Sequence, residues 1–93
     1  MEVNPVPTPN DEYESLVEKE DILVNRIETC TDTIDAVLRS LYEKDGPVHL
    51  QTVRDIVSAM HEVQIKLERE LLIVRAEKRL AARHMDRKPS GFH

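Results

Sequence analysis

A seven-residue repeat of apolar side chains runs from Tyr13 to Leu41 and constrains the fold of this chain more than any other feature. Its a and d positions are Tyr13, Leu16, Glu20, Leu23, Ile27, Cys30, Ile34, Val37 and Leu41. Such a heptad places one apolar stripe along a helix, and Glu20 is its single polar member. No strand-length stretch alternates polar residues with β-branched or aromatic ones. The sequence therefore predicts an all-α fold.

A strong helix stop follows the repeat, and a second apolar stripe follows the stop. Lys44 supplies a cation near the helix end, Gly46 suits a left-handed backbone, and Pro47 cannot continue a helix. The second stripe comprises Val53, Ile56, Val57, Met60, Val63, Leu67, Leu71 and Val74. We therefore predict two long antiparallel helices, a helical hairpin or coiled coil. Its segments are a helix over 10–44, a turn over 45–49 and a helix over 50–86.

Both ends of the chain are predicted to lie outside the hairpin, which spans residues 10–88. Three prolines among residues 1–9 hold their φ angles fixed and disfavour helix before them, so this stretch is expected to be a disordered leader. Asn10 is then a favourable N-cap for the first helix. The tail over 89–93 is expected to be flexible.

The weakest part of the first predicted helix is its threonine-rich middle. Thr29, Thr31 and Thr33 have low helix propensity, and Thr29 with Asp32 imitates a capping box. A bend or break of the helix is therefore expected between Thr29 and Thr33.

Apolar side chains outside the two stripes exceed what a pair of helices can cover. A small core supplies only about 3–5 kcal/mol of stability, so burial of the surplus against other helices would be a gain. The residues predicted to form a protein interface are Val17, Val24 and Leu38 beside the first stripe, Ile65, Leu72, Ile73 and Leu80 off the second stripe, and Leu71 of the second stripe itself. We therefore expect the hairpin to assemble into a multi-helix bundle, as a homo-oligomer or with another helical protein.

Acidic and basic residues are separated along the chain. Residues 1–45 hold twelve acidic residues against four basic ones, whereas residues 75–93 hold six Lys or Arg against two acids. A hairpin would place the acidic start beside the basic end, although exposed ion pairs are worth only about 0–1 kcal/mol each. Glu20, at its a position, is predicted to meet Arg75 or Lys78.

The basic end of the second helix is a candidate contact surface. It comprises Arg75, Lys78, Arg79, Arg83, Arg87 and Lys88. Such a cluster can bind the backbone of a nucleic acid, lie on an anionic membrane, or enter a partner's helix-binding groove. It can also face the acidic helix of the same chain, and this interpretation is favoured because the acidic partner lies at matching depth. No aromatic residue interrupts these cations, so stacking on bases is not supported.

The sequence offers no catalytic, metal-binding or cofactor-binding constellation. Cys30 lies on the apolar stripe with no histidine near it in the helical register, so it is predicted to pack and not to act as a nucleophile. The four histidines lack the spacing of metal ligands. No run approaches the roughly 20 apolar residues that span a bilayer. We therefore expect a non-enzymatic intracellular protein without cofactor, metal or membrane span, cytoplasmic in the simplest case, with nucleus and virion left open.

The leading functional hypothesis is a helical interaction module that serves as a scaffold, an adaptor or an oligomerisation subunit. Two alternatives stay open. One is a small regulator whose basic helix end contacts nucleic acid, and the other is a chaperone-like escort of a helical partner.

Overall fold

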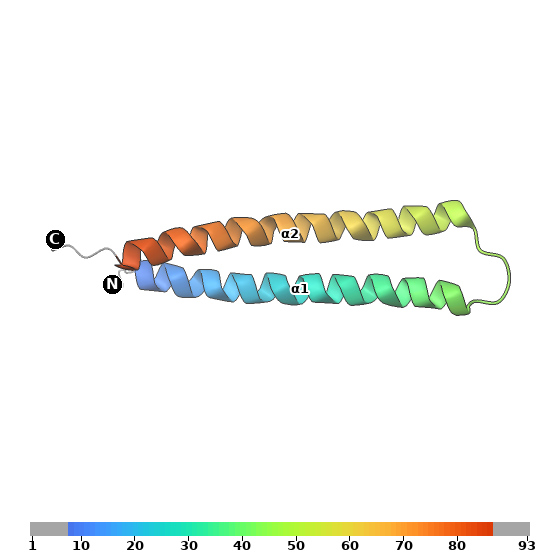
Figure 1. Cartoon of the computed structure of the whole chain (residues 1–93), viewed down its shortest axis with the longest axis horizontal. Coiled ribbons are helices and arrows are strands. Elements are labelled where there is room, and N and C mark those ends of the chain that lie inside the picture. Colours follow the sequence, from blue (N-terminus) through green and yellow to red (C-terminus); the bar gives the residue numbers. More distant parts are fainter. Residues whose placement is uncertain (1–7, 87–93) are drawn as a thin grey trace, which may run out of the picture.

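The computed structural model describes residues 8–86, which form two long helices joined by a short turn (Figure 1). Helix α1 spans Pro9–Glu43 and helix α2 spans Leu50–Asp86. The helices run antiparallel, and their contacts with each other are the long-range contacts of the fold. The predicted all-α helical hairpin is confirmed.

Helix α1 begins at Pro9, one residue before the predicted start, and Thr8 is its N-cap. The Thr8 hydroxyl accepts a hydrogen bond from the Asp11 backbone N–H at 3.1 Å, and the Asp11 carboxylate accepts one from the Thr8 N–H at 3.4 Å. Pro9 occupies the first turn, where its missing N–H costs nothing. Asn10 lies inside the helix, so its prediction as N-cap is wrong. The predicted leader otherwise lies outside the described residues, as does the tail over 89–93.

The threonine-rich middle of α1 is continuous helix. The Thr29 hydroxyl donates to the Asn25 carbonyl at 2.9 Å, and the Thr33 hydroxyl donates to the Thr29 carbonyl at 2.8 Å. Both hydroxyls therefore find their partners in the preceding helical turn, and neither competes for the backbone as a new cap would. The helix does not break over this stretch, because α1 is a single helix from Pro9 to Glu43.

The turn between the helices follows the predicted residues closely. Gly46 has φ +96°, in the region that side chains disfavour, which confirms its role as the left-handed residue. Helix α2 is then capped by His49, whose Nδ1 accepts a hydrogen bond from the Thr52 N–H at 3.3 Å and lies 2.8 Å from the Thr52 hydroxyl. The sequence analysis did not identify this cap, because histidine is not among the favoured N-cap residues.

The helices meet along one seam. On α1 all nine predicted a and d residues are buried or half-buried. On α2 the seam is an unbroken heptad that comprises Val53, Val57, Met60, Gln64, Leu67, Leu71, Val74, Lys78 and Ala81, all likewise buried or half-buried. Ile56 and Val63, which were predicted in this stripe, are instead 48% and 51% exposed. Each lies one position before a seam residue, and one position turns a side chain by about 100° around a helix.

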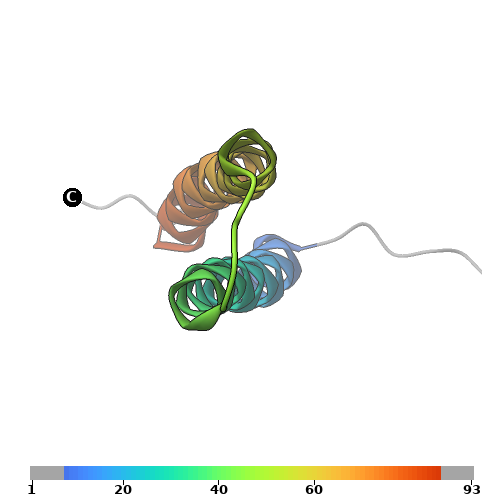
Figure 2. The same cartoon turned by 90° about the vertical axis from the view of Figure 1, so that its right-hand side faces the viewer.

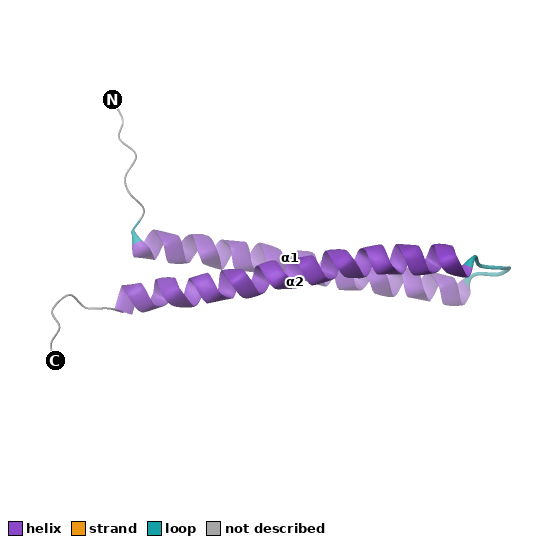
Figure 3. Cartoon of the chain, turned by 90° about the horizontal axis from the view of Figure 1, so that it is seen from above, coloured by secondary structure: helices purple, strands orange, loops and turns teal. Residues whose placement is uncertain are grey.

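The core of the hairpin is short and thin. Its centre is a cluster of Leu23, Leu67, Leu71 and Val74, with Leu16, Val24 and Ile27 packed against it. No side chain in the described residues is completely buried. Viewed from the turn, the described residues form two helices that lie side by side (Figure 2). From above the two helices cross at a shallow angle (Figure 3).

Candidate functional site

The acidic start of α1 and the basic end of α2 meet at Glu20. One oxygen of its carboxylate accepts a hydrogen bond from Nε of Arg75 at 2.8 Å, and the other accepts one from Nζ of Lys78. The hydrogen bond from Lys78, and next the one from Arg75, lowers the pKa of Glu20 below its ordinary value of 4.5. The same bond raises the pKa of Lys78. The predicted contact of Glu20 with Arg75 or Lys78 is confirmed, and it involves both.

The stabilisation from this contact should depend on pH in a defined direction. Because the folded pKa of Glu20 lies below 4.5, its contribution is present above that value and is lost as pH falls through the lowered pKa. Because the pKa of Lys78 is raised above 10.5, its contribution is present below that value and is lost as pH rises through the raised pKa. Glu20→Gln should therefore be less stable than wild type at neutral pH and equal to it in strong acid.

Thermal unfolding followed by circular dichroism across this pH range would measure the effect. Glu18→Gln is the matched control, because Glu18 is exposed and has no ion pair with any residue of 8–86. A difference between wild type and Glu20→Gln that persists unchanged in strong acid would contradict the assignment.

A second polar contact lies on the same side of the hairpin as the Arg75 ion pair. Nε2 of Gln64 donates to the Thr31 hydroxyl at 3.0 Å across the two helices. We call this side the bridged flank, defined by Glu20 and Thr31 of α1 and by Gln64 and Arg75 of α2. In each contact one partner is a seam residue, Glu20 or Gln64, and the other lies beside the seam.

The basic cluster is divided by its contacts. Arg75 and Lys78 are held by Glu20, whereas Arg79 and Arg83 are exposed and form no ion pair with residues 8–86. Arg87 and Lys88 lie outside the described residues. The pairing expected between the acidic start and the basic end is therefore found at two of the four cations that can be assessed.

Exposed apolar side chains outnumber buried ones in the hairpin. Five hydrophobic residues of 8–86 are buried, namely Leu23, Leu67, Leu71, Val74 and Ala81. Twelve large ones are exposed, namely Ile22, Leu38, Tyr42, Val48, Leu50, Ile56, Val63, Ile65, Leu72, Ile73, Leu80 and Met85. Single exposed residues are ordinary on protein surfaces, but apolar residues that share a face are typical of interaction sites.

The residues predicted to form an interface occupy three different environments. Leu71 is buried in the seam, so its assignment to an external interface is wrong; its i+3 and i−4 spacing to Val74 and Leu67 directs it at α1. Val17 and Val24 are half-buried beside the seam on the bridged flank. The others are exposed, with Leu38, Ile65 and Leu72 toward the bridged flank and with Ile73 and Leu80 toward the opposite side.

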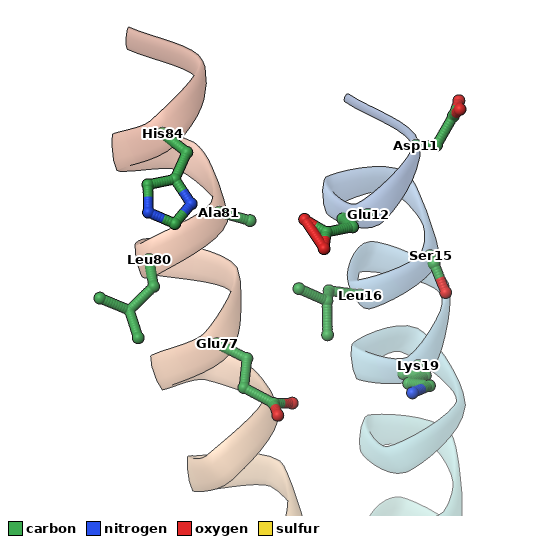
Figure 4. A pocket seen from close by; sticks show the side chains of 9 residues that line it. All are labelled: Asp11, Glu12, Ser15, Leu16, Lys19, Glu77, Leu80, Ala81 and His84. Atoms are coloured by element: carbon green, nitrogen blue, oxygen red, sulfur yellow. The ribbon is translucent and has the colours of Figure 1, made fainter. Parts of the chain in front are cut away.

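The side of the hairpin opposite the bridged flank is hollowed along much of its length. Three hollows between α1 and α2 follow one another there, and neighbouring ones share Lys19 or Arg26 as a lining residue. The hollow near the open end of the hairpin shows Leu16 and Ala81 directed toward each other from the two helices (Figure 4). We call this side the grooved flank, defined by Lys19, Ile22, Arg26, Val63, Glu70, Ile73, Glu77 and Leu80.

Most residues of the grooved flank were not singled out from the sequence. Ile22 is 59% exposed and lies outside the heptad stripe, and the charged residues resemble any solvated helix face. A strict heptad register on α2, counted back from Leu71 and Leu67, would have placed Gln64 in the seam and Val63 on its edge. That register is the signal that could have revealed this flank.

Other side chains with reactive groups serve local contacts. The half-buried Cys30 thiol donates to the Met60 carbonyl, with the sulfur 3.6 Å from the oxygen. Nδ1 of His61 lies 3.3 Å from the amide oxygen of Gln64. Within residues 8–86 no three His, Cys, Asp or Glu residues gather as a group that could hold a metal ion. Neither helix, over its described length, has a stretch apolar enough to cross a membrane.

No protein family, curated protein or solved structure was found to match this chain. The candidate site is therefore defined by the hairpin's own geometry.

Proposed function

We propose that this protein is a non-enzymatic interaction module, a helical hairpin that self-associates or pairs with another helical protein as an assembly or adaptor subunit. The observation that carries the proposal is the excess of exposed over buried large apolar side chains in residues 8–86. Burial of each such side chain is worth about 1.5–3 kcal/mol, which is comparable to the stability of a small core. Association would therefore contribute as much stability as the seam itself.

The shape of the hairpin supports the same proposal. Each of the two helices covers one stripe of the other (Figure 2), and large apolar residues remain exposed outside that stripe on both flanks. Helices with apolar residues beyond a simple a and d stripe are typical of bundles with more than two helices. A scaffold or adaptor that assembles through these faces is the function that this arrangement favours.

The nucleic-acid alternative is supported by fewer residues than the basic cluster suggested. Affinity for a phosphate backbone rises with the number of cations available to it, and Glu20 already engages Arg75 and Lys78. Arg79 and Arg83 are the exposed cations of the cluster within the described residues. We therefore rank protein association above nucleic-acid binding.

Sedimentation velocity of the pure full-length chain over a micromolar dilution series tests the proposal. We expect a mass above that of one chain that falls on dilution. A chain that stays monomeric yet is folded, thermally stable and slow in hydrogen exchange would contradict it. A monomer with fast hydrogen exchange throughout α1 and α2 would instead support pairing with a different helical protein.

A further inference from the structure

The grooved flank carries apolar residues and charges of opposite sign on its two helices. Lys19 and Arg26 lie on the α1 side, and Glu70 and Glu77 lie on the α2 side. None of these four residues forms an ion pair with any residue of 8–86. The apolar residues of this flank next to them are Ile22, Ile73 and Leu80, each more than half exposed. A flank with cations on one helix and anions on the other is complementary to itself.

The two flanks differ in what already occupies them. On the bridged flank the Arg75–Glu20 ion pair and the Thr31–Gln64 hydrogen bond join the helices. On the grooved flank no ion pair or hydrogen bond between side chains joins α1 to α2 within the described range, and hollows lie there instead. Seam residues such as Leu16, Leu23 and Leu67 line those hollows, so an added helix would complete the burial of the core.

We infer that the grooved flank binds the grooved flank of a second copy of this chain, with a two-fold axis parallel to the helices. This inference rests on the proposed function and names its partner. In such a dimer α1 of one copy lies beside α2 of the other, antiparallel, and the four helices form a bundle. Because the two-fold axis repeats every contact, each apolar residue of the flank is buried in both copies.

The positions of the charges along the length of the hairpin, which we call their depth, select this axis. Residues that face each other across the hairpin have numbers that sum to about 95, as Glu20 with Arg75 and Thr31 with Gln64 show. Lys19 and Glu77 line one hollow, and Arg26 and Glu70 line another, so each pair lies at one depth.

A rotation about an axis parallel to the helices preserves depth. It therefore places Lys19 of one copy beside Glu77 of the other and Arg26 beside Glu70. Opposite charges at these positions favour that register and disfavour others. By the same rule of depth, Ile22 of one copy lies level with Ile73 of the other.

Two adjacent residues test which flank is used. Ile73 lies on the grooved flank and Leu72 on the bridged flank, and both are more than half exposed. Ile73→Glu should weaken the dimer about a hundredfold or more, because two buried carboxylates would lack partners. Leu72→Glu should change the dissociation constant by less than about threefold, as exposed substitutions usually do. Sedimentation measures both constants, and circular dichroism checks that helicity is kept.

A variant in which four charges are reversed tests the two-fold axis, and it should leave the fold intact. A chain with Lys19→Glu, Arg26→Glu, Glu70→Lys and Glu77→Lys keeps opposite signs at each depth, so it should fold and dimerise as wild type does. Mixed with wild type, it should form almost no mixed dimer, because each of the four charged contacts between copies would join like charges. Native mass spectrometry of the mixture, with the exchanged chain distinguished by its mass, measures the share of mixed dimers.

The outcomes separate the two claims. A stable, folded wild-type monomer contradicts the proposed function itself. If wild type dimerises but Leu72→Glu disrupts the dimer and Ile73→Glu does not, the function stands and the grooved flank is overturned as the interface. If Ile73→Glu disrupts the dimer but mixed dimers form at the statistical share, the parallel two-fold axis is overturned.

Discussion

Leu67→Asp should leave the hairpin largely unfolded. Leu67 is 4% exposed, the most deeply buried side chain of the seam, and it packs with Leu23, Leu71 and Val74. The substitution removes an apolar side chain, which alone costs about 2–5 kcal/mol, and places a carboxylate among the apolar side chains of Leu23, Leu71 and Val74. Because a core of this size contributes only about 3–5 kcal/mol, the loss equals or exceeds the available stability.

Circular dichroism at low temperature measures this effect as a loss of the helical signal. Ile65→Asp is the matched control, since Ile65 lies two residues away on the same helix and is 40% exposed. It introduces the same charged residue into the same helix, but a carboxylate there stays in water. We expect the control to retain most of the wild-type helicity. Equal loss in both variants would show that Leu67 is not a seam residue.

Leu71→Ala and Leu72→Ala should have very different effects although the residues are adjacent. Leu71 is 9% exposed in the core, whereas Leu72 is 67% exposed. The core is thin and none of its side chains is completely buried, so the space left by Leu71→Ala can be partly filled and the cost should lie near the lower end of the usual range. We expect Leu71→Ala to lower the free energy of unfolding by about 2 kcal/mol or more. Leu72→Ala should change it by less than about 0.5 kcal/mol.

Denaturant and thermal unfolding at a single low protein concentration measure the difference. In a domain of this size about 2 kcal/mol corresponds to a fall in Tm of roughly 8 °C or more. Alanine has the highest helix propensity, so Leu72→Ala can even raise the Tm slightly. A large fall in the Tm of Leu72→Ala, at a concentration where the chain is monomeric, would mean that Leu72 stabilises the single hairpin and not only an assembly.

Three consecutive residues thus report on three surfaces. Leu71 reports on the seam, Leu72 on the bridged flank and Ile73 on the grooved flank. Neighbours along a helix point about 100° apart, so a change of one position moves the same type of side chain from the core to either flank. This is why hydrophobicity alone, without the register, assigned all three residues to one interface.

The two helices, their antiparallel order and the turn could be predicted from local chemistry. Each signal depends only on residues that are close together in the sequence. These signals are the heptad over Tyr13 to Leu41, the glycine and proline of the turn, and the second periodic stretch. The meeting of Glu20 with Arg75 and Lys78 was also predictable, since a hairpin of known turn fixes which depths face each other. Local rules failed at Asn10, because Thr8, two residues earlier, is also a favourable cap and is followed by Pro9, which suits the first helical position.

The sequence by itself determined that this chain forms two amphipathic helices with more apolar surface than one seam can cover, because periodicity and turn signals depend only on neighbouring residues. The tertiary structure decided which apolar residues fill the seam and which remain outside. Rotation of α2 about its axis is set by packing against α1, and it directs Leu71 inward while Ile56, Val63 and Ile73 face outward. It also separates the bridged flank from the grooved flank, because only the docked pair of helices defines two sides.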